Sequence, residues 1–354
     1  MRTALAVATF LTLASPVPAQ QPLRPARPVL TEQASGTTAL LQAVSAVSDS
    51  VAWVSGHRAT WARTTNGGRT WQPGAMTGAD SVLQFRDVHA LSADSAWLLA
   101  AGPGERSRIY FTADGGRSWQ LQFLNRDSSA FFDCFDFWDA RRGVAVSDAV
   151  NGRMVVITTD DGGASWRPVP GEALPDALPG EGAFAASGAC LVSRGGGKAW
   201  FATGAQEGAR VYASEDYGRT WSVARTPIVH GQAAGIAALA FRDDRHGFAL
   251  GGRLADPRDT AAVNSAATTD GGRTWTTGAR PPLPGAVYGA GIVPGGVTTL
   301  VAVGPSGMAY RTDGCTPWTQ LSDQAYWAIG FHGPRAWAVG PGGRITRLDV
   351  EPGC

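Results

Sequence analysis

Thr112-Ala113-Asp114-Gly115-Gly116-Arg117-Ser118-Trp119 is one copy of an octet that recurs along this chain and dictates its fold. Four further copies occupy residues 64–71, 159–166, 214–221 and 268–275. A sixth, degenerate copy spans residues 311–318, with Cys315 at a glycine position and Pro317 at the position of the hydroxyl residue. Each copy ends in a tryptophan, and successive tryptophans are 43 to 55 residues apart. A period of this length is typical of a protein in which each repeat is one structural unit.

A short apolar segment ending in a small or hydroxyl residue precedes each copy, and a seventh such segment follows the last one. These segments are residues 52–56, 96–100, 143–147, 199–203, 247–251, 300–304 and 336–340. Short β-rich runs at this pitch, separated by glycine, proline and aspartate, are typical of propeller blades. The 46 glycines among 354 residues agree with an all-β fold that has many tight turns. We therefore predict a seven-bladed β-propeller built from four-stranded antiparallel blades, spanning residues 28–354.

The seventh unit lacks a strand at its end, because the chain stops soon after residues 345–348. At the other end, residues 28–32 (Pro-Val-Leu-Thr-Glu) form a spare strand-like segment before the first unit. We predict that this N-terminal strand completes the last blade and closes the ring. A ring closed in this way leaves no long open sheet edge.

The N-terminus has the pattern of an export signal. Arg2 is followed by an apolar stretch over residues 4–14 and by Val17-Pro18-Ala19, a small-residue cleavage site. We expect residues 1–19 to be a signal peptide, residues 20–27 a linker, and the mature chain a periplasmic or secreted monomer. The mature chain contains no segment long and apolar enough to span a bilayer. The full sequence has 30 basic and 29 acidic residues, which nearly cancel, so charge offers no argument for a nucleic-acid partner.

The repeated octet resembles the bacterial neuraminidase repeat, or Asp-box, over nearly all of the mature chain. Similar repeats occur in sialidases, in sortilin-type propellers and in propellers like the photosystem II stability/assembly factor. The order of a strand ending in glycine, a short turn, another strand and then the octet resembles the assembly-factor type most. That resemblance implies a role in holding a membrane or secreted protein during assembly or stabilisation.

We interpret the octets as structural turns. The acidic or amide side chain can accept backbone N–H groups, the glycines allow positive φ, and the tryptophan can pack on the sheet. One carboxylate per turn is too few for calcium, which takes about 6–8 oxygen ligands, so we expect no metal and no cofactor. The residues assigned to this role are Asn66, Trp71, Asp114, Trp119, Asp161, Trp166, Asp216, Trp221, Asp270, Trp275, Asp313 and Trp318.

Four cysteines form two candidate pairs. Cys134 lies ten residues before Val144 and Cys190 ten before Trp200, which places both at one position in the inner strands of blades three and four. Such strands approach each other near the propeller axis, where a disulfide is within reach. The remaining pair, Cys315 and Cys354, would pin the C-terminus, and we favour this second bond over the first. Free buried thiols are the alternative for both pairs.

The repeats also act as controls for one another and point to a polar sector on the face opposite the octets. One inner-strand position is polar in blades one to three (Gln42, Arg86, Asp133) and is Ala, Ala, Ala and Tyr in blades four to seven. Three residues later, blades two and three carry His89 and Asp136. His57 and Asp148 stand at the end of second strands, where other blades have small residues.

We therefore expect Arg86, His89, Asp133, Asp136, Asp148 and His57 to share one sector of the top face or channel. This sector is either a pocket that recognises a peptide or glycan or a hydrogen-bonded ring lining a water-filled channel. A long Pro- and Gly-rich loop over residues 168–187 lies on the same side, as a lid, a partner-binding loop or a tolerated insertion.

No catalytic motif is evident. A sialidase-like chain would carry an arginine in the first inner strand, but residues 40–45 (Leu-Leu-Gln-Ala-Val-Ser) contain none. Asp133, Asp136 and Asp148 could supply the two carboxyl groups that other glycoside hydrolases need. No phosphate loop, nucleotide fingerprint or nucleophile elbow is present. The sequence favours an exported, non-catalytic scaffold for a protein partner in the cell envelope, with glycan binding or hydrolysis as the alternative.

Overall fold

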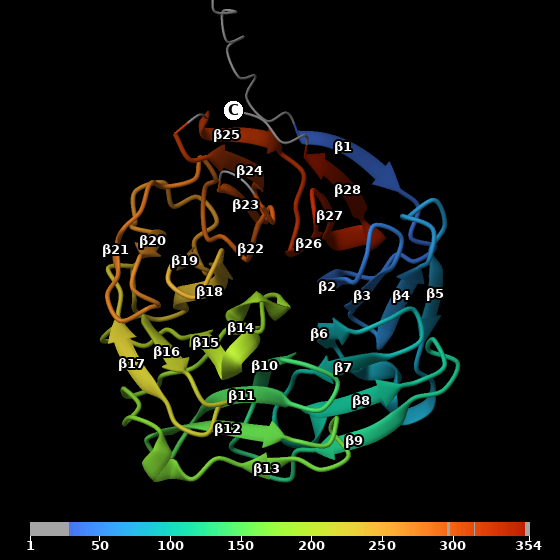
Figure 1. The fold of residues 1–354 in the computed structure, drawn as a ribbon, viewed down its shortest axis with the longest axis horizontal. Helices are drawn as coiled ribbons and strands as arrows, with labels where there is room; N and C mark the ends of the chain where they lie inside the picture. The colour runs from blue at the N-terminus through green and yellow to red at the C-terminus, as the bar shows by residue number, and fades with distance from the viewer. Residues whose placement is uncertain (1–27, 296–297, 315, 351–354) are drawn as a thin grey trace, which may run out of the picture.

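The computed structural model describes residues 28–295, 298–314 and 316–350. Figure 1 shows seven sheets arranged as blades around a central axis. Each sheet has four antiparallel strands in chain order, except the last, whose order is β1-β28-β27-β26. The predicted fold class, a seven-bladed all-β propeller, is confirmed.

The strands of the first four blades run from the axis outward. Blade one is β2 (Leu41–Ala46), β3 (Ala52–Gly56), β4 (Thr60–Thr64) and β5 (Gln72–Ala75), and blade two is β6 (Phe85–Ala90), β7 (Ala96–Ala100), β8 (Arg108–Thr112) and β9 (Gln120–Leu124). Blade three is β10 (Phe132–Phe137), β11 (Gly143–Val150), β12 (Arg153–Thr159) and β13 (Arg167–Pro168), and blade four is β14 (Leu191–Arg194), β15 (Lys198–Ala202), β16 (Arg210–Ser214) and β17 (Ser222–Arg225).

The last three blades complete the ring. Blade five is β18 (Ala234–Phe241), β19 (Gly247–Arg253), β20 (Ser265–Thr268) and β21 (Thr276–Thr277), and blade six is β22 (Gly289–Ile292), β23 (Thr299–Gly304), β24 (Gly307–Thr312) and β25 (Thr316–Ser322). Blade seven is β26 (Ala328–His332), β27 (Arg335–Val339), β28 (Ile345–Val350) and β1 (Pro28–Gln33). The six helical turns in the described residues are short 3-10 segments: η1 (Gly78–Val82), η2 (Gly104–Arg106), η3 (Gly171–Ala173), η4 (Gly188–Cys190), η5 (Gly195–Gly197) and η6 (Pro341–Gly343).

The N-terminal strand closes the ring as the sequence predicts. Strand β1 is the outer strand of blade seven and pairs antiparallel with β28, with Leu30 opposite Leu348. Because the two ends of the chain share one sheet, the last blade has its full set of four strands.

The core lies between neighbouring blades. The second strands β3 and β7 are buried at every residue, because each is covered by sheets on both faces. Trp97 of blade two stacks on Phe137 of blade three, with ring centroids 4.2 Å apart. Burying a large apolar side chain of this kind contributes about 1.5–3 kcal/mol. The aromatic residues of the inner strands therefore hold one blade against the next.

The octets form tight turns at the ends of the third strands. In blade two, the backbone N–H of Ser118 donates to Asp114 Oδ1 at 2.9 Å, and that of Gly116 donates to Thr112 Oγ1 at 2.9 Å. Hydrogen bonds from the Ser118 hydroxyl and backbone lower the pKa of Asp114 to about 2. Gly116 has φ +84°, and a Cβ on it would collide with the Trp61 ring, so this position requires glycine for both its conformation and its contact.

One of the two candidate disulfides is formed. Cys134 of β10 and Cys190 of η4 are bonded, with their Cα atoms 6.2 Å apart. Cys190 lies in a helical turn before β14, not on the inner strand as the repeat alignment placed it. Cys315 and Cys354 lie outside the described residues, as do the expected signal peptide and linker.

Candidate functional site at the mouth of the central channel

The last part of the long loop between blades three and four crosses the propeller axis. Segment 183–190 ends in η4, which contacts the inner strands β2, β6, β10, β18 and β22 of five other blades. In Figure 1 the segment before β14 lies near the middle of the ring. We call residues 183–190 the plug segment, because together they close the channel.

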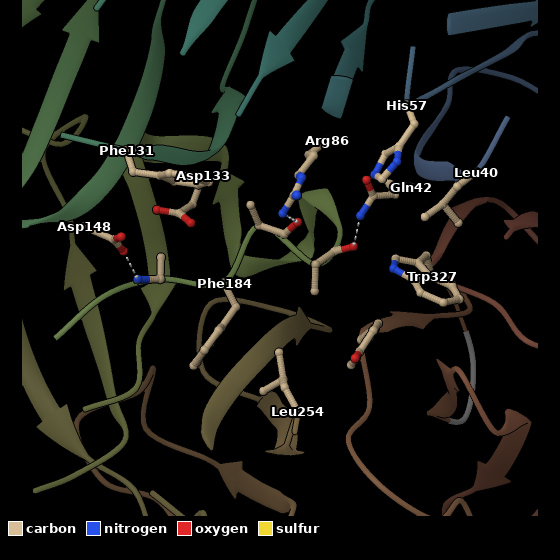
Figure 2. A pocket seen from close by; sticks show the side chains of 14 residues that line it. Leu40, Gln42, His57, Arg86, Phe131, Asp133, Asp148, Phe184, Leu254 and Trp327 are labelled. Atoms are coloured by element: carbon tan, nitrogen blue, oxygen red, sulfur yellow. Dashed lines mark hydrogen bonds between the residues drawn. The ribbon is translucent and has the colours of Figure 1, made fainter. Parts of the chain in front are cut away.

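Side chains from several blades hold the plug segment by its backbone. Gln42 Nε2 donates to the carbonyl of Ala186 at 3.4 Å, and an Arg86 N–H donates to the carbonyl of Ala185 at 3.3 Å. On the other flank, the N–H of Ala183 donates to Asp148 Oδ1 at 3.1 Å (Figure 2). The polar sector predicted from the repeats therefore binds backbone of this chain itself, in the stretch and turn that lead into η4.

A β-bulge explains why these residues face the channel. The pairing of the inner with the second strand shifts register between Leu41 and Ala43, between Phe85 and Asp87, and between Phe132 and Cys134. The unpaired residues at these shifts are Gln42, Arg86 and Asp133, the same three that share one position of the repeat. A bulge re-aims the side chain of its extra residue. Blade five has the same shift, but its extra residue is Ala237.

A pocket of about 470 Å³ opens above the plug segment. Figure 2 shows polar side chains from blades one to three on one flank and apolar side chains on the other. The lining residues are Leu40, Gln42, His57, Arg86, Phe131, Asp133, Asp148, Ala183, Phe184, Ala185, Ala186, Leu254, Tyr288 and Trp327. Four of the six predicted site residues, Arg86, Asp133, Asp148 and His57, thus share this pocket.

Burial dominates the electrostatics of the pocket. It raises the pKa of Asp133 well above its ordinary value, and the negative charge of Asp148 adds to this effect. Burial also raises the pKa of Asp148, to about 6. Burial and the charge of Arg86 lower the pKa of His57, so this histidine is neutral at pH 7. The pocket therefore combines the Arg86 guanidinium with two carboxyl groups whose pKa values are raised.

Arg86 has no carboxylate partner. Its guanidinium donates to Gln84 Oε1 through Nε and Nη2 and to the Ala185 carbonyl through Nη1. No salt bridge in the described part of the chain includes it. Three of its five N–H groups are therefore used and its charge is not neutralised by contact.

The other two predicted site residues lie outside the pocket. His89 Nδ1 and Asp136 Oδ1 are 2.7 Å apart, and Asp136 Oδ2 accepts the N–H of Ser193 at 2.7 Å. These bonds join the inner strands of blades two, three and four. His89 and Asp136 therefore have a structural role, and the expected single sector divides into a pocket and a clamp.

A buried acid and an aromatic wall were not predicted from the sequence. Asp87 is 5% exposed and accepts the N–H groups of Val88 and Phe135, while burial raises its pKa to about 8. The available signal was the acidic residue Asp87 between Arg86 and Val88 on the inner strand β6. Tyr288 and Trp327 come from the start of blades six and seven, and neither residue type nor spacing marked them as pocket residues.

A groove continues the pocket outward over blades four and five. It has a volume of about 460 Å³ and shares Asp148, Ala183 and Phe184 with the central pocket. Its other lining residues are Pro179, Gly180, Gly182, Gly204, Ala205, Gln206, Gly231, Gln232 and Ala233. Four of these are glycines: a Cβ on Gly180 or Gly231 would meet open space, whereas Gly182 and Gly204 are packed and hydrogen-bond each other.

Within residues 28–295, 298–314 and 316–350, no three His, Cys, Asp or Glu side chains are placed to hold a metal ion. No helix in the same part of the chain is long and apolar enough to cross a membrane.

Comparison with known proteins supports the fold. No protein-family model and no curated protein matches this sequence. The structure of YCF48 bound to D1 peptide is similar, with a TM-score of 0.62 at 16% identity over 93% of this chain and 98% of that one. A virginiamycin B lyase from Staphylococcus aureus has a TM-score of 0.61 at 14% identity, over 92% of this chain and 100% of that one.

An ancestral GH74 enzyme has a TM-score of 0.61 at 12% identity, covering 93% of this chain and 46% of the enzyme. The similar structures thus include a peptide-bound propeller and two enzymes, and at these identities the likeness concerns the fold alone. The chain is a seven-bladed β-propeller whose plugged channel carries a pocket at one mouth.

Proposed function

We propose that this protein is an exported, non-catalytic scaffold that holds an extended segment of a partner protein in the cell envelope. One observation carries the proposal: the central pocket and the radial groove join through Asp148, Ala183 and Phe184. Together they form a long trench, a shape that suits an extended chain. In its outer part, Gly180 and Gly231 carry no side chain and have open space where a Cβ would lie, so a peptide can approach closely there.

The plug segment supports the same conclusion. Gln42, Arg86 and Asp148 already bind main-chain groups, those of residues 183–186 of this chain. The fold is also that of a propeller seen with a bound peptide, YCF48 with its D1 peptide. The side chains of this sector therefore already form hydrogen bonds with main-chain groups.

Glycan binding or hydrolysis is the second candidate, and Asp133 with Asp148 is the observation that favours it. Two carboxyl groups whose environments alter their pKa values can act as an acid–base pair. Against this, Asp148 accepts the N–H of Ala183 and Asp133 that of Ala185, as carboxyl groups with a structural role do. Both enzyme folds and the YCF48 fold are similar to this chain, so the fold does not decide between the candidates.

Site-specific crosslinking in the native cell envelope tests the proposal. A photoreactive residue replaces Gln232 in the groove, and in the matched control it replaces Arg219, an exposed residue of an octet at the opposite end of the strands. We expect one discrete protein adduct from position 232, absent from position 219 and reduced by Arg86→Gln/Asp148→Asn. Captured oligosaccharide, or equal labelling from both positions, would reject the scaffold function.

A further inference from the structure

The pocket contains buried oxygens with few or no hydrogen-bond partners among the described residues. Gln42 is 4% exposed, and its Nε2 faces the Ala186 carbonyl, which leaves Oε1 unpartnered. Asp133 is 2% exposed, and its Oδ2 has no partner except the Asp148 carboxyl group, to which it can bond only while one of the two is protonated. Leaving such an atom unsatisfied costs about 1–3 kcal/mol. Both oxygens are acceptors when Asp133 is ionised, so they call for a ligand that donates hydrogen bonds.

The two carboxyl groups form the strongest acceptor site of the pocket. Figure 2 shows Asp133 and Asp148 next to each other at one end of the pocket, with Phe131 and Phe184 near that end. Asp148 also lines the radial groove, so it stands where the pocket and the groove meet. An extended chain lying in the groove would pass this point, and a cation there would meet both carboxyl groups.

We propose, building on the scaffold function above, that the partner segment places a basic side chain, lysine or arginine, on Asp133 and Asp148 at this junction. The charged and titratable groups that face the pair are Arg86 from blade two and His57 from blade one, while Tyr288 is the titratable group on the opposite wall. The plug segment and blades five and seven contribute no charge to the pocket lining.

Charge balance distinguishes a cationic from an anionic ligand. Arg86 already supplies one positive charge beside the two carboxyl groups, and burial favours the protonated form of both Asp133 and Asp148. A bound cation favours the ionised form of these carboxyl groups, so binding of a basic side chain releases protons to solvent. An anion bound at Arg86 would instead favour proton uptake by Asp148. The two ligand classes therefore give opposite pH dependences.

The test uses the mature full-length chain and three capped probe peptides, Ac-Gly-Lys-Gly-NH2 and its norleucine and glutamate counterparts. Their dissociation constants are measured by NMR titration between about pH 6 and 8, the range in which the raised carboxyl pKa values matter. Proton exchange is measured by calorimetry in two buffers of different ionisation enthalpy. We expect the lysine probe to bind most tightly, to gain affinity as the pH rises and to release protons on binding.

Two variants locate the site. Asp148→Asn should weaken the lysine probe roughly tenfold, as loss of one partner of a close charge pair does, and should leave the norleucine probe unchanged. Asp160→Asn, a matched change of an exposed aspartate at the octet end of blade three, should alter neither. Asp133→Asn, if it folds by circular dichroism, should reduce proton release.

Preferential binding of the glutamate probe, affinity that falls as pH rises, or equal behaviour of all three probes would overturn this proposal. The scaffold function is tested separately by crosslinking at position 232. A groove adduct that persists in Asp148→Asn without any lysine preference would reject the basic side chain and retain the scaffold.

Discussion

Cys134 of blade three and Cys190 at the end of the plug segment are joined by a disulfide, so a covalent bond holds the plug against the channel wall. The bond closes a loop with a sequence separation of 56 residues, which includes β11, β12, β13 and the whole Pro- and Gly-rich loop. Reduction of this bond would remove the covalent link between the plug segment and blade three, so the link depends on the redox environment of the compartment.

We predict that loss of this disulfide lowers the free energy of unfolding by about 2–4 kcal/mol, because the unfolded chain is no longer constrained by a long loop. Urea unfolding of the wild type with and without reductant, beside Cys134→Ala/Cys190→Ala, measures this. The double variant should unfold at the same midpoint in both conditions. A wild type insensitive to reductant would contradict the prediction.

Asp148→Asn should stabilise the protein at pH 7 to 8 by about 3 kcal/mol. Burial raises the pKa of Asp148 from an ordinary value of 3.8 to about 6, so the folded state binds more protons than the unfolded state between these values. Wild-type stability therefore falls as the pH rises through this window, and the amide variant lacks that loss.

Thermal or urea unfolding from about pH 4 to 8 tests the effect of Asp148→Asn. The stability difference between variant and wild type should shrink toward the acid end, where the folded wild type also carries an uncharged side chain. A difference that stays constant with pH would mean that hydrogen bonding to Ala183, and not ionisation, sets the contribution of Asp148.

Glu181→Ala should destabilise the fold by about 3–5 kcal/mol, because it leaves the buried Arg210 cation without its partner. The Glu181 side chain is fully buried, and its Oε1 accepts from Arg210 Nε at 2.9 Å and from the Thr203 hydroxyl at 2.6 Å. Glu181 lies just before the plug segment, so the variant should also reduce crosslinking from the groove.

The same loop offers a matched control for Glu181→Ala. Asp176 pairs with Arg153, but its side chain is 84% exposed. Asp176→Ala should therefore change the unfolding free energy by less than about 1 kcal/mol. Equal losses in the two variants would show that the loop tolerates an unpaired Arg210.

Gly116→Ala should lower the free energy of unfolding more than Gly152→Ala does. Both glycines have positive φ, +84° and +78°, where a Cβ costs about 1–2 kcal/mol. A Cβ at Gly116 would also collide with Trp61 of blade one, whereas none of the described atoms lies within 4 Å of one at Gly152. Urea unfolding gives the loss of unfolding free energy in each variant. The loss in Gly116→Ala should exceed that in Gly152→Ala by about 1–3 kcal/mol, and this difference measures the contact of the octet with the neighbouring blade. Equal losses would show that Trp61 moves aside freely.

Part of the site was predictable because repeats share one backbone. Gln42, Arg86 and Asp133 occupy one repeat position, and the contrast with Ala237 in blade five distinguishes them in the sequence alone. His89 and Asp136 depart from the pattern equally, yet they form a clamp between blades. A polar residue at a repeat position thus shows that its side chain needs polar partners. It does not show whether these partners belong to this chain or to a bound ligand.

The seven blades, the turn chemistry of the octets and the closure by β1 all follow from the amino-acid sequence, because each depends on a local pattern repeated along the chain. Three features depend instead on the folded ring: residues 183–190 cross the channel, Cys134 pairs with Cys190, and Asp148 lies at the junction of pocket and groove. These features join segments far apart in sequence, and the plug has no counterpart in the other described blades. Their positions follow from the closure of the whole ring, which brings side chains of five blades around one non-repeated segment.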